Sequence, residues 1–153
     1  MASERLQVTD VRGRTPVTDS SNKLGWLLED LSVPGVRFSV LLSEDGLRIA
    51  HSAGIERDQA ERFSAAASGL RSLGKALGEF CGDADNGVRQ NMTEYDQGMI
   101  LITAAGDGAL LGVATTPEID VALIAHRMNE LAGRVGHELG SQPRRRVDGG
   151  ELP

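Results

Sequence analysis

The residues best suited to acid–base chemistry lie in the stretch SVLLSEDGLRIAHSAG, residues 39–54. It holds two carboxylates, Glu44 and Asp45, and an imidazole, His51, and such groups can move protons when they lie close together. The same stretch also fits two short apolar strands around Asp45-Gly46, a dipeptide that favours a hairpin turn. In a hairpin, His51 lies roughly 16 Å along the strand from the turn, too far to share a proton with either carboxylate. We therefore interpret the stretch as a hairpin with exposed turn residues and a surface histidine.

The other reactive residue types show no spacing that indicates a catalytic or metal site. Cys81 is expected at the end of a helix, where the helix dipole does not activate a thiol. His126 and His137 share a predicted helix but lack the H-E-x-x-H pattern and a cysteine partner. The GDG run at 106–108 lacks the Lys-Ser/Thr of a phosphate loop and precedes a strand, which favours a hairpin turn. We therefore expect a protein that is not an enzyme and has no cofactor.

Composition and charge narrow the class of protein further. The net charge of −6 over 153 residues argues against nucleic-acid binding, which needs a clustered basic face. The run Arg144–Arg146 lies beside Pro143, and we expect it to stay solvated. A single cysteine excludes an internal disulfide and favours a reducing compartment. No signal-like segment and no apolar run of about 18 residues occurs, so we expect a cytoplasmic protein without stable membrane insertion.

Changes in periodicity divide the chain into three parts. Residues 1–19 are predicted to be a flexible leader, residues 20–140 one domain, and residues 141–153 a flexible tail. Aromatic residues make up only 3% of the chain, so the core of the domain must consist mainly of aliphatic side chains.

The predicted elements of the domain are, in order, a helix over 20–32, strands over 36–43 and 47–52, a helix over 55–80, three strands within 86–116 and a helix over 117–139. Asp19 or Ser20 is the expected cap of the first helix, and Thr116-Pro117-Glu118 is the expected start of the last. The order α-β-β-α-β-β-β-α predicts an α+β fold, a five-stranded antiparallel sheet flanked by helices.

The helix expected over 55–80 is unusually poor in bulky side chains. Gly69, Gly74 and Gly78 each cost about 0.5–1 kcal/mol relative to alanine, so close approach of another element must compensate. That element is either the chain's own sheet or a copy of the same helix, and both alternatives stay open. Residues 86–97 are polar, as expected of an edge strand, and an unpaired edge is a template for another strand.

These two features together predict a symmetric homodimer in which edge strands pair and the middle helices touch. The residues expected at this interface are the small and apolar ones of the helix and the edge strand: Ala66, Gly69, Leu70, Leu73, Leu77, Val88 and Met92.

Three segments together resemble the Roadblock/dynein light chain family, in the bacterial branch found beside Ras-like small GTPases in actinomycetes. They are PGVRFSVLLSEDGLRIAHSAG, ERFSAAASGLRSLGKALGEF and GMILITAAGDGALLGVATTPEIDVALIAHRM. None is specific alone, but their order and spacing between about residues 24 and 139 make the likeness strong.

The resemblance implies a Roadblock-like, profilin-like sandwich that is usually a homodimer, with a regulatory or scaffold role in small-GTPase signalling. The implied partners are a Ras-like small GTPase and the histidine-kinase-like and accessory proteins encoded with it. In this setting Arg62, Arg71 and Lys75 are expected to be exposed beside the middle helix and to contact an acidic switch region of the GTPase.

A second hypothesis comes from a different class of protein, a small-ligand sensor with a pocket between the sheet and the helices. Such pockets usually carry inward-facing polar or aromatic side chains, whereas the strands here are mainly aliphatic and the chain has one Trp and one Tyr. A ligand-induced rise in melting temperature would favour this hypothesis.

Overall fold

The computed structural model describes residues 22–83 and 87–140, so the predicted leader, its capping residues Asp19 and Ser20, and the predicted tail lie outside the described residues. The elements, with η for a 3-10 helix, are η5 (Gly25–Leu31), β1 (Val36–Ser43), β2 (Arg48–His51), α1 (Arg57–Leu77), η6 (Gly78–Cys81), β3 (Gln90–Tyr95), β4 (Gly98–Ala104), β5 (Ala109–Thr115) and α2 (Val121–Gly140).

The five strands form one sheet in the order β2-β1-β5-β4-β3, and every neighbouring pair is antiparallel. The centre of the sheet is the pairing of β1 with β5, in which Leu41 lies opposite Leu111. The expected five-stranded antiparallel sheet flanked by helices is therefore confirmed.

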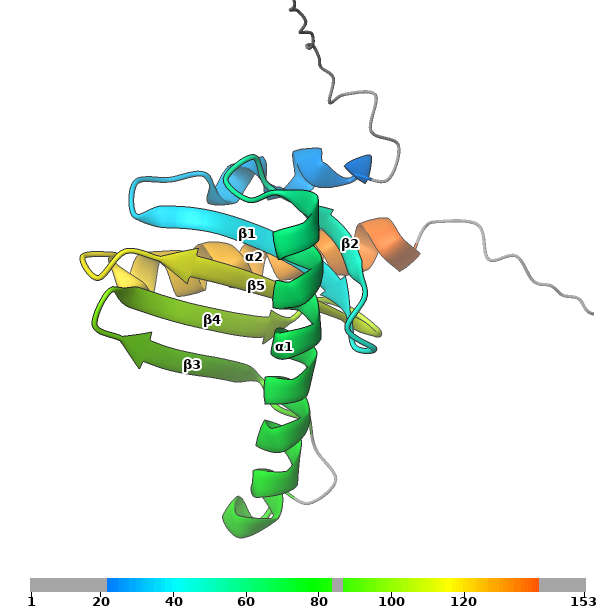
Figure 1. Cartoon of the computed structure of the whole chain (residues 1–153). Coiled ribbons are helices and arrows are strands. Elements are labelled where there is room, and N and C mark those ends of the chain that lie inside the picture. Colours follow the sequence, from blue (N-terminus) through cyan, green and yellow to red (C-terminus); the bar gives the residue numbers. More distant parts are fainter. Residues whose placement is uncertain (1–21, 84–86, 141–153) are drawn as a thin grey trace, which may run out of the picture.

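Helices cover the two faces of the sheet (Figure 1). On one face, α2 and η5 enclose a core that includes Leu41, Leu111 and Met128. On the other face, α1 crosses the strands above a smaller core that includes Val40 and Ile102. Successive strand residues point to opposite faces, so each central strand supplies both cores and becomes apolar on both sides.

The first helix differs in type from the α-helix expected over 20–32. The buried leucines are those that the spacing predicted, Leu27, Leu28 and Leu31. The side chain of Asn22 does not cap the helix, because it is hydrogen-bonded to the backbone of His51. A Cβ on Gly25 would lie 2.8 Å from Nδ2 of Asn22, so the chain is tightly packed here. Between this anchor and Pro34 the chain forms only the short 3-10 helix η5, a common connector.

The last helix begins later than expected, and the predicted start at residues 116–118 is wrong. The N–H of Thr116 donates to the carbonyl oxygen of Gly35 at 2.8 Å, so this residue closes the end of the sheet. The cap is Asp120, whose Oδ1 accepts from the N–H of Leu123 at 3.1 Å. The helix therefore starts beside the next residue that has a capping side chain.

The predicted hairpin of β1 and β2 is confirmed, and its turn also supports α1. Gly46 has φ +92°, a conformation that favours glycine. The hydroxyl of Ser68 on α1 donates to the carbonyl oxygen of Glu44 at 2.6 Å. Glu44 is exposed, as expected, and its Oε2 also lies 3.9 Å from Nη2 of Arg71. The acidic turn thus positions α1 and takes no part in proton transfer with His51.

Candidate protein–protein interface

The C-terminal part of α1 extends beyond the sheet, past the edge formed by β3 (Figure 1). We call residues 72–81, which include η6, the overhang. The buried positions of α1 end at Arg71, and Leu73 and Leu77 are 68% and 63% exposed. Phe80 on η6 is also exposed. A protomer alone therefore leaves three large apolar side chains of the overhang in water.

Small residues form a stripe on the side of α1 that faces away from the sheet. At roughly 100° per residue, Ala66, Gly69 and Leu73 fall on the side opposite to Ser64 and Arg71, which are buried. Apart from the adjoining backbone of the helix itself, no atom of the described residues lies within 4 Å of a Cβ built on Gly69, so packing among them does not explain this glycine. Close approach of another molecule would explain it.

The other two helix glycines are explained by the chain's own packing. A Cβ on Gly74 would lie 2.9 Å from Nδ2 of Asn91 and 3.0 Å from Cγ2 of Val88. A Cβ on Gly78 would lie 2.9 Å from the carbonyl oxygen of Asp83. The sequence left open whether these glycines pack against the same chain or against a second copy of the helix. Gly74 and Gly78 pack against the same chain. A substitution at Gly74 would disturb the protomer itself and is a poor test of a dimer.

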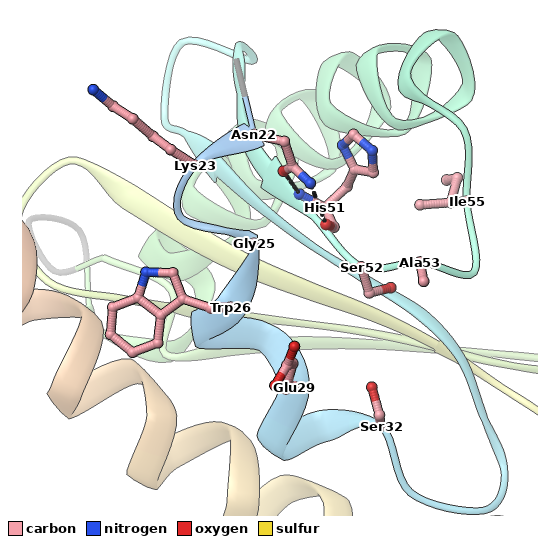
Figure 2. Close-up of a pocket in the computed structure, with 10 residues that line it drawn as sticks. All are labelled: Asn22, Lys23, Gly25, Trp26, Glu29, Ser32, His51, Ser52, Ala53 and Ile55. Atoms are coloured by element: carbon pink, nitrogen blue, oxygen red, sulfur yellow. Dashed lines mark hydrogen bonds between the residues drawn. The ribbon is translucent and has the colours of Figure 1, made fainter. Parts of the chain in front are cut away.

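The two edges of the sheet differ in how they are covered. β2 has four residues, and the Asn22 carboxamide pairs with the backbone of His51 like a neighbouring strand (Figure 2). Oδ1 of Asn22 accepts from the N–H at 2.8 Å, and Nδ2 donates to the carbonyl oxygen at 3.2 Å. β3 has six residues and, in the described ranges, no strand on its outer side. Met92 and Tyr95 on β3 are exposed, so this edge is open to pairing.

Leu70 and Val88, both expected at the dimer interface, are half-buried in the protomer. Leu70 packs against the core beneath α1, and Val88 lies against Gly74 just before β3. Leu70 and Val88 therefore pack beneath the candidate interface and contribute little exposed area to it. Ala66, Gly69, Leu73, Leu77 and Met92 are exposed, as an interface requires.

Arg71 was expected to be an exposed partner-binding cation, and this expectation is wrong. The residue is only 8% exposed. Its Nη1 donates to the carbonyl oxygen of Val88 at 2.6 Å, and its Nη2 faces the carboxylate of Glu44. Arg71 therefore ties the segment before β3 and the β1–β2 turn to α1, and it holds the candidate interface in place.

We expect Arg71→Met to lower the free energy of unfolding by about 2 kcal/mol, because the carbonyl of Val88 loses its donor. Urea unfolding followed by circular dichroism measures this loss. The matched control is Lys75→Met on the same helix, which removes an exposed cation and should change stability by less than about 0.5 kcal/mol. Equal losses in the two variants would contradict the structural role of Arg71.

The other two expected partner-binding cations, Arg62 and Lys75, are exposed. They lie thirteen positions apart in the chain, which places them roughly 140° apart around the helix axis. Arg62 shares the outward side of α1 with Gly69, whereas Lys75 lies on the sheet-facing side of the overhang. One partner surface therefore cannot contact both cations through the same side of α1.

The residue types that could ligate a metal ion do not cluster in the described ranges. Within them, no three His, Cys, Asp or Glu residues come close enough to hold a metal ion. His126 lies 3.6 Å from Glu130 in an exposed pair one helical turn apart, and Cys81 is exposed on η6. No helix in the described ranges has the length and apolar character needed to cross a membrane.

Apolar side chains, including Phe38 and Phe63 beneath α1, fill the space between the sheet and the helices, where the ligand-sensor hypothesis requires a pocket. A groove of about 1040 Å³ lies instead at the surface, between η5 and residues 51–55 (Figure 2). The sensor hypothesis therefore gains no support from the interior of the fold.

Comparison with known protein families assigns the chain to one of them. The sequence model of the Roadblock/LC7 domain matches residues 26–115, more than half of the chain. The chain belongs to the Roadblock/LC7 family. The resemblance inferred from the sequence is therefore confirmed, and no enzyme family is indicated.

Solved structures agree with this membership. This Roadblock/LC7 protein is similar to two Roadblock/LC7 domains from Streptomyces avermitilis. One is 36% identical with a TM-score of 0.71, over 76% of this chain and 98% of that one. The other is 40% identical with a TM-score of 0.59, over 74% and 98%. Myxococcus xanthus MglB shares the fold at 14% identity, with a TM-score of 0.66 over 81% and 98%. A comparison with curated proteins gave no match.

Sequence reasoning missed three residues of this surface and its surroundings. Phe80 continues the apolar spacing of the middle helix, but the sequence does not show that the helix leaves the sheet before this point. Tyr95 stands in a polar strand next to a turn, where an aromatic residue was a usable signal of an exposed contact. Asn22 gave no signal, because its pairing with His51 joins distant segments.

Proposed function

We propose that this Roadblock/LC7 protein is a non-catalytic, homodimeric regulator or scaffold that binds a bacterial Ras-like small GTPase in the cytoplasm. The observation that carries the proposal is the exposed apolar overhang beside the open β3 edge, in a chain of this family. The resemblance in sequence links such folds to small-GTPase signalling. Histidine-kinase-like and accessory proteins encoded with the GTPase are further proposed partners.

The proposed homodimer forms through α1 and β3. Because α1 extends past β3, a second sheet joined to this edge would lie next to the overhang (Figure 1). A two-fold arrangement uses the same patch on both copies, so Leu73 and Leu77 of each copy approach the α1 helix of the other. Gly69 and Ala66 allow the two helices to come close. Burial of the exposed leucines supplies a favourable free energy of about 1.5–3 kcal/mol for each side chain.

The proposed GTPase contact uses exposed cations of α1. Arg62 lies in the N-terminal half of the helix, outside the overhang and one turn before Ala66. Lys75 is the second candidate, on a different side. An acidic switch region would be attracted to either residue, and rim charges of this kind act mainly on the association rate and on its salt dependence.

The direct test measures binding to the Ras-like GTPase encoded nearest the gene, loaded with GDP or with a non-hydrolysable GTP analogue. Biolayer interferometry gives Kd for each form. Tighter binding to the GTP form would support a regulator or effector that reads the switch regions. No binding to either form would contradict the GTPase proposal. Light scattering on the protein alone tests the dimer separately, so that the two parts of the proposal can fail independently.

We expect Arg62→Glu to weaken GTPase binding about tenfold, because a carboxylate then faces an acidic partner surface. The matched control is Arg127→Glu, which makes the same charge change at an exposed position on α2, across the sheet. Its Kd should stay within about twofold of the wild-type value. Equal effects of the two substitutions would show a response to net charge and would contradict a contact at Arg62.

A further inference from the structure

Trp26 on η5 is 56% exposed and lies between two surface grooves, on the face of the sheet opposite to α1. The first is the groove of about 1040 Å³ that continues to residues 51–55. The second has about 410 Å³ and is bordered by α2. Figure 2 shows the indole extending toward α2, away from the strand β2 that carries His51. This surface lies outside the proposed dimer and GTPase contacts and is independent of them.

An exposed tryptophan at a groove is a common anchor for a bound segment. The side chain can bury about 150–250 Å² and favours a cation over its ring. The neighbouring residues Leu27 and Leu28 are buried in the core, whereas Trp26 is exposed. The exposure of Trp26 is therefore not explained by a lack of core beneath η5.

The charges beside the indole are mainly carboxylates. Glu29 lies in the first groove, and Glu130 and Glu138 border the second, with Oε2 of Glu130 also 3.6 Å from Nε2 of the exposed His126. Lys23 also lines the first groove, and its side chain extends away from Glu29 (Figure 2). Arg134, which borders the second groove, is already paired with Asp30. The surface therefore suits an arginine-rich occupant better than an acidic one.

The end of α2 brings such an occupant to the groove. His137 and Glu138 border the second groove, and α2 ends at Gly140. The run Arg144–Arg146 follows four to six positions later, within a reach of roughly 13–20 Å for an extended chain. Glu29 forms no ion pair with another described residue and so is free to accept one.

We propose that the grooves beside Trp26 bind the chain's own Arg144–Arg146 segment. One guanidinium stacks on the indole, and the others pair with Glu29 and Glu130. Arginine suits this role because its planar group can stack on a ring and pair with a carboxylate through two hydrogen bonds. This replaces the expectation that the run stays solvated.

The test uses the fluorescence of Trp26, which is the only tryptophan of the chain. In the full-length protein, the triple variant Arg144→Glu, Arg145→Glu, Arg146→Glu should raise the acrylamide quenching constant about twofold and shift the emission to longer wavelength, because the indole loses its cover. Salt at about 1 M, where the Debye length is about 3 Å, should do the same to the wild-type protein. Circular dichroism checks that the fold is unchanged.

The matched control is Arg5→Glu, Arg12→Glu, Arg14→Glu, which makes the same charge change at the other end of the chain. Its quenching should equal that of the wild type. Adding Glu29→Arg and Glu130→Arg to the Arg144–Arg146 variant should restore low quenching, because the ion pairs are re-formed with the charges exchanged. Three results would overturn the proposal: unchanged quenching in the tail variant, a change in the control instead, or quenching that depends on protein concentration, which indicates the tail of a second copy.

Discussion

The double substitution Leu73→Asp, Leu77→Asp is expected to convert the proposed homodimer into a monomer. Both side chains belong to the overhang and are mostly exposed in the protomer, so the fold itself should tolerate the change. In the dimer, each aspartate would place an unpaired carboxylate against the partner's apolar side chains. Four such groups for each dimer should raise the dimer dissociation constant by more than about 100-fold. Sedimentation or light scattering over a range of concentrations measures this change.

The matched control for this experiment is Leu123→Asp on α2, a large apolar residue that is 43% exposed but lies across the sheet from α1. It should leave the dissociation constant within about twofold of the wild-type value. A dimer that survives the Leu73 and Leu77 substitutions would exclude the overhang as the interface. Loss of the dimer in the Leu123 variant would move the interface to the α2 face.

Gly98→Ala is expected to give the largest loss of stability among these single substitutions. A Cβ at this position would lie 1.9 Å from the carbonyl oxygen of Thr115, and φ is +151°. β4 would therefore have to move away from β5 at the point where Gly98 pairs with Tyr95 of the open edge. We expect a decrease of about 2–4 kcal/mol in the free energy of unfolding, measured by urea denaturation.

Gly108→Ala is the matched control for Gly98→Ala, because it separates backbone strain from steric clash. Gly108 also has a positive φ, +77°, but beyond its chain neighbours no atom in the described part of the chain lies within 4 Å of the position that its Cβ would take. Only the conformational cost remains, and we expect a loss of about 1 kcal/mol. Equal losses of unfolding free energy at the two positions would show that Thr115 can move away from the new Cβ at little cost. The clash at Gly98 would then contribute little to the effect.

Local sequence patterns predicted most elements of the fold, because local interactions determine them. Asp45-Gly46 forms the β1–β2 turn, since glycine adopts the positive φ that the turn requires. Helical spacing identified α1 and the buried face of η5. The predictions were wrong where a residue that could form a local interaction bonds to a distant part of the chain instead. Thr116 has the side chain of a helix cap, but its backbone bonds to Gly35, and Asp120 caps α2 instead.

The candidate interface could be predicted only in part. Leu73, Leu77 and Met92 were expected at an interface and are exposed. Arg71 was expected beside them but is buried, because Val88 and Glu44, from two other segments, provide its partners. A helical pattern shows which residues share a side, but it does not show how far the sheet extends beneath the helix.

The sequence by itself determined the family, through the order and spacing of three segments along the chain. It also determined the order of strands and helices and the absence of a recognisable catalytic motif, since these depend on residue types at short spacing. Only the tertiary structure decided that α1 extends past the sheet, that Asn22 covers β2 while β3 stays open, and that Arg71 is internal. The physical reason is that burial and edge pairing depend on contacts between residues far apart in the chain. Periodicity along the chain carries no information about which of these distant segments meet.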